Sequence, residues 1–308
     1  MKELVLPLLL SLLAFAGSAQ PPIEVNPSRL NQNLEALAAF GKDERGRPNR
    51  VAFSDGDLEA RAFVMGLMKQ AGLETSVDAA GNIIGRRKGK NPKLPPLGLG
   101  SHIDMVPLGG DYDGCVGSMA AIEVAQTLQE KGIQTTHPME VIIFANEEGG
   151  VMGSRALAGV LKPEALGVVN STGYSMGEGI MRLGGDTTRL SGIIRPKGSM
   201  AAFLELHIEQ GGLLESANRD IGVVEGIVGL RWWAVRVQGR ANHAGTTPMD
   251  LRQDALLAAA RFIQAVNEEA LKMDGKQVAT VGRIHAHPGA PNVIPGEGIL
   301  SLEIRDLS

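Results

Sequence analysis

The chain has 308 residues, of which 44% are hydrophobic and 21% are charged, and its formal net charge is -4. This composition is typical of a globular protein with a large core or two domains. The charge balance gives no basic excess that would point to nucleic acid as a partner. A single cysteine, Cys115, excludes an intrachain disulfide framework and a cysteine-rich zinc module. Its place at the start of a helical pattern allows a depressed thiol pKa, but burial in the core is the commoner role.

The segment 1–19 has the pattern of a secretory signal. Lys2 precedes an apolar run that extends to Ala16, and small residues follow as a cleavage site. We therefore expect removal of this segment, a secreted or periplasmic protein, and no stable membrane association after cleavage. Glu3 and Pro7 depart from the usual pattern, so an uncleaved anchor or a mis-assigned start codon stays open, and the latter would make the protein cytoplasmic.

The next residues predict two helices and a strand pair without chemistry of their own. A cap at Asn26, followed by Pro27 and apolar residues at helical spacing, predicts the first helix. Ser54 with Asp57 has the pattern of a capping box for the second helix. Apolar residues on both sides of the turn 80–82 predict a hairpin or a sheet edge.

The stretch 97–114, LGLGSHIDMVPLGGDYDG, predicts a metal site at the carboxyl edge of a parallel sheet. A short apolar run ends at His102, and Asp113 precedes a helical pattern that extends to about Lys131. Imidazole and carboxylate together suit divalent zinc, manganese, cobalt or nickel, and a carboxylate can bridge two ions. Asp104 would fix the tautomer of the imidazole. The alternative is that these residues only end a strand and cap a helix.

Two adjacent glutamates follow the next apolar run. Residues 139–145, MEVIIFA, have the length and composition of a buried parallel strand, and Glu147 and Glu148 come directly after it. Buried side by side without a cation, the two carboxylates would repel each other. The simplest interpretation is that Glu148 ligates a metal while Glu147 is the general base and proton shuttle. The alternative is a pair of solvated loop carboxylates.

A second histidine is a further candidate ligand. The segment 204–212, LELHIEQGG, alternates apolar and polar residues up to His207, which would offer a fourth ligand at the same edge of the sheet. Taken alone, His207 would more often be a satisfied core histidine.

A polar stretch at 216–220 predicts a domain boundary. We expect a catalytic domain over 20–217 and a second domain over 218–308, whose βαββ order is most of a ferredoxin-like lid. Its predicted elements are a β-rich stretch at 221–238, a helix with a capping-box pattern at Asp250 and Gln253 that ends near Asn267, and strands at 278–284 and 299–304.

These motifs, in this order, resemble the M20 metallopeptidase superfamily. Within it they resemble the amidase branch of N-carbamoyl-L-amino-acid hydrolases, allantoate amidohydrolases and β-ureidopropionases. The resemblance runs from about Asn26 to the last residue, and five stretches carry it: GSHIDMVPLGGDYDG, FANEEG, LELHIEQG, ANHAGTTPMDLRQDALLAAA and ATVGRIHAHPGAPNVIPGE. It implies an α/β catalytic domain with a mostly parallel central sheet flanked by helices, an incomplete ferredoxin-like lid, and two divalent metal ions (Zn, Mn, Co or Ni) per subunit.

The resemblance also implies roles for single residues, with Asp113 bridging the two ions, the two histidines on separate ions, and Asp104 supporting His102. The implied metal ligands are His102, Asp113, Glu148 and His207. Glu147 would be the catalytic base, and His243 would stabilise the oxyanion. The implied substrate contacts are Gln210, His243, Asn292 and Arg305, of which Arg305 would hold a substrate carboxylate.

The implied reaction is metal-dependent hydrolysis of a non-peptide C–N bond in a small carboxylate-bearing substrate, an N-carbamoyl amino acid or a ureido compound such as allantoate. Another M20 activity, that of a peptidase or an N-acyl-amino-acid deacylase, is the alternative. We expect the lid to pair two chains in a homodimer.

Two departures from the family pattern affect these expectations. The family continues beyond the position of Ser308 with a segment that supplies a further metal-binding histidine in a Ser-Gly-Ala-Gly-His-like motif. No such motif occurs here, and His285 and His287 have the wrong neighbours. We therefore expect a fragment with an incomplete second metal site, and a catalytically incomplete binding chain stays open. The loop after Glu148 is also shorter than usual, which leaves the substrate open.

Overall fold

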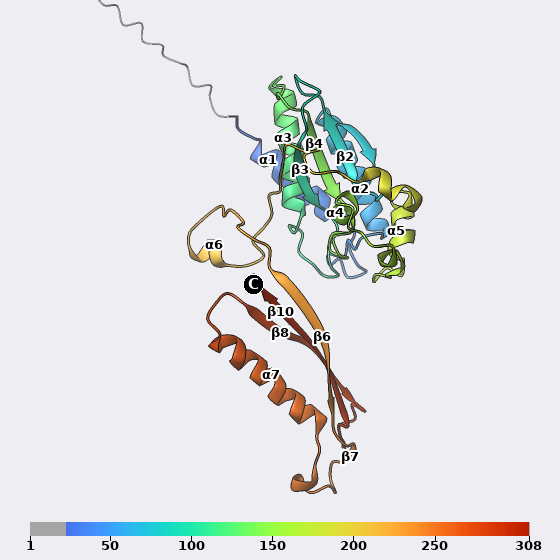
Figure 1. Cartoon of the computed structure of the whole chain (residues 1–308), viewed down its shortest axis with the longest axis vertical. Helices are drawn as coiled ribbons and strands as arrows, with labels where there is room; N and C mark the ends of the chain where they lie inside the picture. The colour runs from blue at the N-terminus through green and yellow to red at the C-terminus, as the bar shows by residue number, and fades with distance from the viewer. Residues whose placement is uncertain (1–22, 308) are drawn as a thin grey trace, which may run out of the picture. The chain divides into compact units, whose positions relative to one another are not determined.

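The computed structural model describes residues 23–307, and the predicted signal segment lies outside them. The chain forms two compact units that divide between Leu213 and Leu214, within the short helix α6 (Leu213–Ser216). Figure 1 shows the elements of both units. No helix in the described part of the chain has the length and apolar character needed to cross a membrane.

The first unit is built on a five-stranded sheet with the order β1-β2-β4-β3-β5. Strands β4, β3 and β5 run parallel to one another, whereas β1 and β2 form the predicted hairpin and β2 is antiparallel to β4. The strands are β1 (Glu74–Val77), β2 (Ile83–Arg87), β3 (Leu97–His102), β4 (Met139–Phe144) and β5 (Ala202–Leu204).

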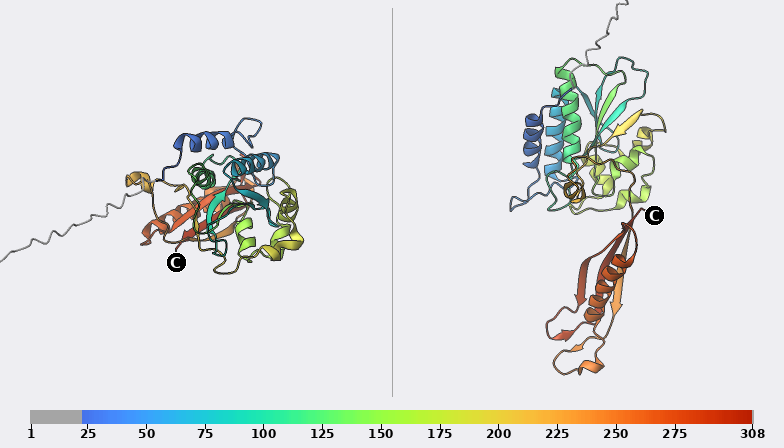
Figure 2. Two further views of the ribbon diagram at one scale, coloured as in Figure 1. Left: turned by 90° about the horizontal axis from the view of Figure 1, so that it is seen from above. Right: turned by 90° about the vertical axis from the view of Figure 1, so that its left-hand side faces the viewer.

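Helices cover both faces of this sheet (Figure 2). Along β4, Val141 and Ile143 pack with the core of α1, α2 and α3, whereas Ile142 packs on the other face with Leu157 of α4. This alternation follows from the two-residue period of a strand. The helices are α1 (Pro27–Ala38), α2 (Asp55–Gln70), α3 (Cys115–Glu130), α4 (Met152–Leu157) and α5 (Met176–Arg182), with 3-10 turns η1 (Pro163–Gly167) and η2 (Thr187–Ile193).

The helix starts are set by the side chains that the sequence indicates. The Asn26 side chain accepts a hydrogen bond from the backbone N–H of Arg29, and Ser54 Oγ accepts one from the N–H of Asp57. The carboxylate of Asp57 accepts from the N–H of Phe53 at 2.8 Å, so the capping-box pattern at α2 closes one residue earlier than predicted.

The second unit is a three-stranded antiparallel sheet with the order β6-β10-β8, beside a two-stranded β7-β9 pair. Helix α7 packs on the sheet where Gly298 of β10 leaves room for Ala255 and Ala259. The elements are β6 (Gly229–Gln238), β7 (Asn242–His243), η3 (Met249–Leu251), α7 (Ala255–Lys272), β8 (Val278–His287), β9 (Val293–Ile294) and β10 (Glu297–Asp306).

The predicted bounds of the helix in this unit were wrong. Helix α7 begins after Asp254, whose side chain accepts from the N–H groups of Leu256 and Leu257, and it extends to Lys272. Asp250 lies in the separate turn η3. The carbonyl of Gln253 accepts a hydrogen bond from the N–H of Arg240, which holds the chain in a non-helical conformation up to Asp254.

Candidate metal centre

His102 is the last residue of β3 and is buried against the start of α3. Its Nδ1 lies 3.0 Å from the backbone carbonyl oxygen of Asp104. Because a carbonyl oxygen only accepts, this contact places the proton of the neutral ring on Nδ1. The lone pair of Nε2 then points away from the backbone and is available to a metal ion.

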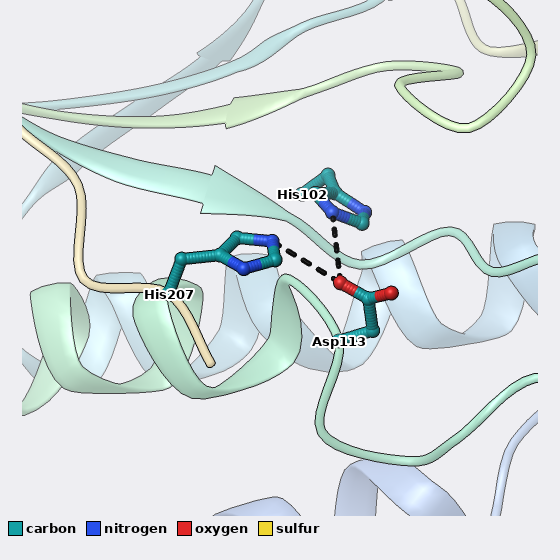
Figure 3. A group of neighbouring side chains, drawn as sticks. All are labelled: His102, Asp113 and His207. Atoms are coloured by element: carbon teal, nitrogen blue, oxygen red, sulfur yellow. Dashed lines mark ion pairs between the residues drawn. The ribbon is translucent and has the colours of Figure 1, made fainter. Parts of the chain in front are cut away.

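Asp113 lies two residues before α3 and directs its carboxylate at His102 and His207 (Figure 3). Its Oδ1 lies 3.1 Å from His207 Nε2 and 3.8 Å from His102 Nε2. Gly114 has φ +63°, and a Cβ atom there would lie 2.4 Å from the imidazole of His102. Only glycine therefore allows the chain to turn so closely past the ring.

His207 follows β5 and repeats the arrangement of His102. Its Nδ1 lies 2.9 Å from the carbonyl oxygen of Ile208, so its Nε2 lone pair also faces Asp113. The ligand atoms of His102, Asp113 and His207 all lie within 4.8 Å of one another. Within residues 23–307, this is the one group of three histidine, cysteine or acidic side chains with that geometry.

The chemistry of this group fits a divalent cation. Asp113 Oδ1 is buried and accepts no hydrogen bond, although two imidazole nitrogens face it. A buried acceptor without a donor is unfavourable by about 1–3 kcal/mol, and native structures rarely leave one. Two nitrogen lone pairs and one carboxylate oxygen around a common point are ligands that zinc, manganese, cobalt or nickel would accept.

The two predicted glutamates lie in the loop that follows β4. Glu147 Oε2 lies 3.6 Å from His102 Nε2, and the Glu147 side chain is 32% exposed, so water can reach it. Glu148 lies outside the group of three ligand atoms, although its charge and those of Asp113 and His102 affect one another. The structure therefore brings Glu147 to the centre and places Glu148 beside it.

Asp104 contacts His102 through its backbone and the glutamate loop through its side chain. The hydrogen-bond acceptor for His102 Nδ1 is the backbone carbonyl of Asp104, whereas its carboxylate Oδ1 is 3.8 Å from that nitrogen. The carboxylate oxygens instead accept the backbone N–H groups of Glu147 and Glu148, each at 3.1 Å. Asp104 thus joins the histidine and the glutamate loop through separate atoms.

The centre carries more negative than positive charge. Burial raises the pKa of Asp104 to about 7. Burial also raises the pKa of Glu148, and the charges of Asp113 and Glu147 raise it further. For His102, burial acts to lower the pKa, but the carboxylates of Asp104, Glu147 and Glu148 together raise it. Burial of carboxylates and the repulsion between neighbouring ones are both unfavourable to their charged forms, and a bound cation would relieve both effects.

The predicted substrate residues occupy three different places. Gln210 belongs to the first unit, where its Nε2 donates to Asp113 Oδ2 at 2.5 Å. In the second unit, the N–H of Ala244 donates to the carbonyl of Asn292 at 3.0 Å, which holds His243 and Asn292 on neighbouring segments.

His243 is exposed, and its Nδ1 accepts a hydrogen bond from the N–H of Gly245 at 3.0 Å. In the neutral ring the proton is therefore on Nε2, which can donate to a substrate oxygen.

Arg305 lies far from His243 within the second unit and pairs with Glu303. His243 pairs with Val293, just before β10 begins at Glu297, and Arg305 is near the other end of that strand. Eight steps along a strand at roughly 3.3 Å each separate Glu297 from Arg305 by about 26 Å. One chain therefore does not bring Arg305 and His243 to the same small substrate.

Two buried side chains near the centre, Arg50 and Asn82, were not among the predicted site residues. Arg50 donates from Nε to the carbonyl of Ile103 at 2.7 Å and from a terminal nitrogen to Cys115 Sγ at 3.1 Å. Asn82, which we assigned only to a turn, contacts the glutamate loop. No local motif marks either residue. Cys115 is buried, and burial raises its thiol pKa, so the alternative of a depressed thiol pKa was wrong.

A His-Asp-His group at the carboxyl edge of a parallel-containing sheet, with a glutamate pair in the next loop, defines a metal-dependent hydrolase. Residues 98–294 match the profile of peptidase family M20/M25/M40. The chain belongs to this family, as its motifs predict.

Several proteins similar to this chain are amidohydrolases that act on C–N bonds. The chain is 44% identical to an N-carbamoyl-L-amino acid amidohydrolase of Geobacillus stearothermophilus, covering 92% of this chain and 70% of that protein. It is 34% identical to the allantoate amidohydrolase of Escherichia coli strain K12, with coverage of 90% and 68%. An amidase of the hydantoinase/carbamoylase family from Burkholderia multivorans superposes with a TM-score of 0.79 at 37% identity, covering 93% of this chain and 70% of that structure. The predicted class, a C–N amidohydrolase of the M20 family, is confirmed.

Proposed function

We propose that this protein hydrolyses the ureido C–N bond of an N-carbamoyl amino acid or of a related ureido acid such as allantoate. One observation carries the proposal: Asp113 Oδ1 is buried without a hydrogen bond between two imidazole nitrogens, next to a water-accessible carboxylate on Glu147. The similar amidohydrolases of this family support the choice of substrate class.

The residues that would hold metal are His102, Asp113 and His207, with Glu148 beside them. A divalent ion bound there supplies Lewis-acid chemistry, which polarises a carbonyl group and makes water more acidic. The two ions per subunit that the resemblance implies for the complete family site are part of this proposal. The bridging role of Asp113 is supported by its position between the two rings, whose centroids are 5.8 Å apart.

Glu147 moves the proton. Its Oε2 takes a proton from the attacking water and delivers it to the leaving nitrogen as the C–N bond breaks. Hydrolysis of an N-carbamoyl amino acid in this way yields the free amino acid and carbamate, which decomposes to ammonia and carbon dioxide. The Asp104 carboxylate keeps Glu147 in place by accepting a hydrogen bond from the backbone N–H of Glu147.

The second unit supplies recognition. His243 Nε2–H donates to the oxygen on which negative charge develops. The Arg305 guanidinium matches a substrate carboxylate with two parallel hydrogen bonds. Because Arg305 and His243 lie at opposite ends of one unit, we propose that the pair serving one substrate comes from two chains of a homodimer.

The test is a substrate panel on the full chain supplied with Zn, Mn, Co or Ni. We expect ammonia release from N-carbamoyl-L-amino acids or allantoate, and none from N-acetyl amino acids or dipeptides. Glu147→Gln keeps the shape of the side chain but removes its basicity, so kcat should fall at least about a hundredfold with unchanged metal content. Amino-acid release from dipeptides or acetylated substrates alone would assign the peptidase or deacylase activity instead. Equal activity in Glu147→Gln would remove Glu147 from the mechanism.

A further inference from the structure

The loop that carries Glu147 and Glu148 is held at its base by a residue from another part of the chain. This loop, residues 145–153, joins β4 to the start of α4. Its two ends bind each other through the N–H of Gly153 and the carbonyl of Ala145 at 3.0 Å. The remaining backbone groups of the same two residues bind the side chain of Asn82, through Oδ1 to the Ala145 N–H at 2.9 Å and through Nδ2 to the Gly153 carbonyl at 3.2 Å.

Asn82 is itself fixed. It is fully buried, and its Nδ2 also donates to Asp78 Oδ2 at 2.8 Å, while its backbone N–H donates to Asp78 Oδ1 at 2.9 Å. Both amide hydrogens and the amide oxygen therefore have partners. A flipped amide would place its NH2 group against the N–H of Ala145 and its oxygen against two other oxygens, so the partners define the orientation.

The loop needs such support because its backbone is strained. Asn146 has φ +49° and Val151 has φ +51°, which is the left-handed region, and valine is β-branched. Strained residues of this kind persist where the surrounding structure holds them, and they gather at functional sites. Gly153 is part of the same fit, because a Cβ atom there would lie 1.9 Å from Asn82 Oδ1.

We propose that Asn82 is a positioning residue for the hydrolase, which sets the place of the Glu147 carboxylate by holding both ends of its loop. This inference rests on the proposed function for its catalytic consequence. Asp104 binds the middle of the loop at the N–H groups of Glu147 and Glu148. Asn82 closes the base of the loop. With the backbone held at both places, the Glu147 carboxylate lies 3.6 Å from His102 Nε2, and its remaining freedom is rotation of its own side chain.

The experiment exchanges the Asn82 amide for a carboxylate and then restores one of its two contacts. Asn82→Asp loses the hydrogen bonds to both Asp78 and Gly153. The double variant Asp78→Asn, Asn82→Asp restores the first contact with donor and acceptor exchanged, but it leaves the Gly153 carbonyl without its donor. Asn91→Asp is the matched control, since Asn91 is exposed and uses only its Oδ1, toward the N–H of Lys93.

Hydrogen exchange and steady-state kinetics on the full chain then separate fold from position. We expect the double variant to recover the Tm that Asn82→Asp loses, yet to keep faster amide exchange over 145–153 and a kcat at least tenfold below the parent, with KM within twofold. Recovery of both kcat and slow exchange in the double variant would overturn the proposal, as would unchanged exchange in Asn82→Asp.

A second variant covers the case in which Asn82→Asp does not fold. Gly153→Ala places a methyl group against Asn82 Oδ1 and the backbone nitrogen of Ala145, and alanine favours the helix that begins there. This variant should raise the rate of amide hydrogen exchange over 145–153 and lower kcat. An exchange rate and a kcat equal to those of the parent chain would contradict the proposal. The exchange measurement does not depend on turnover. If the parent chain hydrolyses none of the substrates, the proposed function fails while the exchange result still decides the role of Asn82.

Discussion

His102 in the first unit and His243 in the second unit are both fixed by a backbone group at Nδ1, with opposite results. The Nδ1 of His102 faces a carbonyl oxygen, so the proton is on Nδ1 and the Nε2 lone pair is free. The Nδ1 of His243 faces a backbone N–H, so the proton is on Nε2. One ring is therefore prepared to bind a cation and the other to donate a hydrogen bond. The backbone partner of Nδ1 therefore assigns the chemical role of each ring.

The two rings also differ in burial and in the charges around them. His102 is buried among carboxylates that raise its pKa, and Gly114 packs directly against its ring. His243 is exposed, and within residues 23–307 its side chain accepts a hydrogen bond only from the nearby backbone N–H of Gly245. We therefore expect changes near His102 to affect metal binding and stability, and changes at His243 to affect turnover alone.

The largest effect is expected from Asp113→Asn, which removes the anionic oxygen between the two histidines. Loss of a residue that only supports a metal ligand typically weakens metal affinity by roughly 10–100-fold. Loss of the ligand Asp113 should weaken metal affinity more than that, and hydrolysis should be lost. The new amide can donate to an imidazole nitrogen, so the metal-free variant should gain about 1 kcal/mol, or roughly 2–4 °C in Tm. Metal content after dialysis and a melting curve in chelator measure both effects.

Asp111→Asn is the control for this variant, because Asp111 belongs to the same loop and pairs with Lys42 near the surface. It should retain metal and activity. Full metal binding by Asp113→Asn would show that Asp113 is not a ligand.

A smaller effect is expected from His243→Asn, which removes the Nε2 donor but leaves the first unit intact. We expect kcat to fall by roughly 10²–10³, as for the loss of an oxyanion donor, with unchanged metal content. His285→Asn, another histidine of the second unit, should be active. Loss of metal from His243→Asn would contradict the assignment of metal binding to His102 and of hydrogen-bond donation to His243.

Mixing His243→Asn with an equally inactive Arg305→Ala chain sharpens this prediction. Random reassociation makes about half of the dimers mixed, and one of the two sites in each mixed dimer has both residues intact, so about a quarter of the parent activity should return. Activity that stays at zero would place both residues of each site on one chain or remove them from the site.

The smallest effect is a pH dependence of stability in the metal-free chain. Burial raises the pKa of Asp104 to about 7, above its value in the unfolded chain, so the folded state binds the additional proton. This contribution to stability is fully present below roughly pH 4 and is lost as the pH rises toward 7, so Tm should fall over that interval. Asp104→Asn should flatten the slope, and so should metal loading. A slope that is unchanged in Asp104→Asn would assign the titration to another group.

Much of the centre could be predicted because its parts follow local rules. An apolar strand that ends in His102, and another that ends before Glu147, are visible in runs of a few residues, and parallel strands bring such ends to one edge. The support for these residues could not be predicted in the same way. Asn82 contacts residues 63 and 71 positions away, and Arg50 contacts a carbonyl 53 positions away. Such contacts depend on packing, for which no single sequence carries a local pattern.

The place of His207 also decides when the centre can form. His102 and Asp113 both lie just before α3, whereas His207 follows the three-residue strand β5, which pairs only with β3 within the described residues. During synthesis the ribosome must add about a hundred more residues after His102 before the second imidazole exists, and loops of that length close late in folding. Uptake of metal by the nascent or refolding chain therefore reports the docking of β5, a late step that secondary structure alone would not reveal.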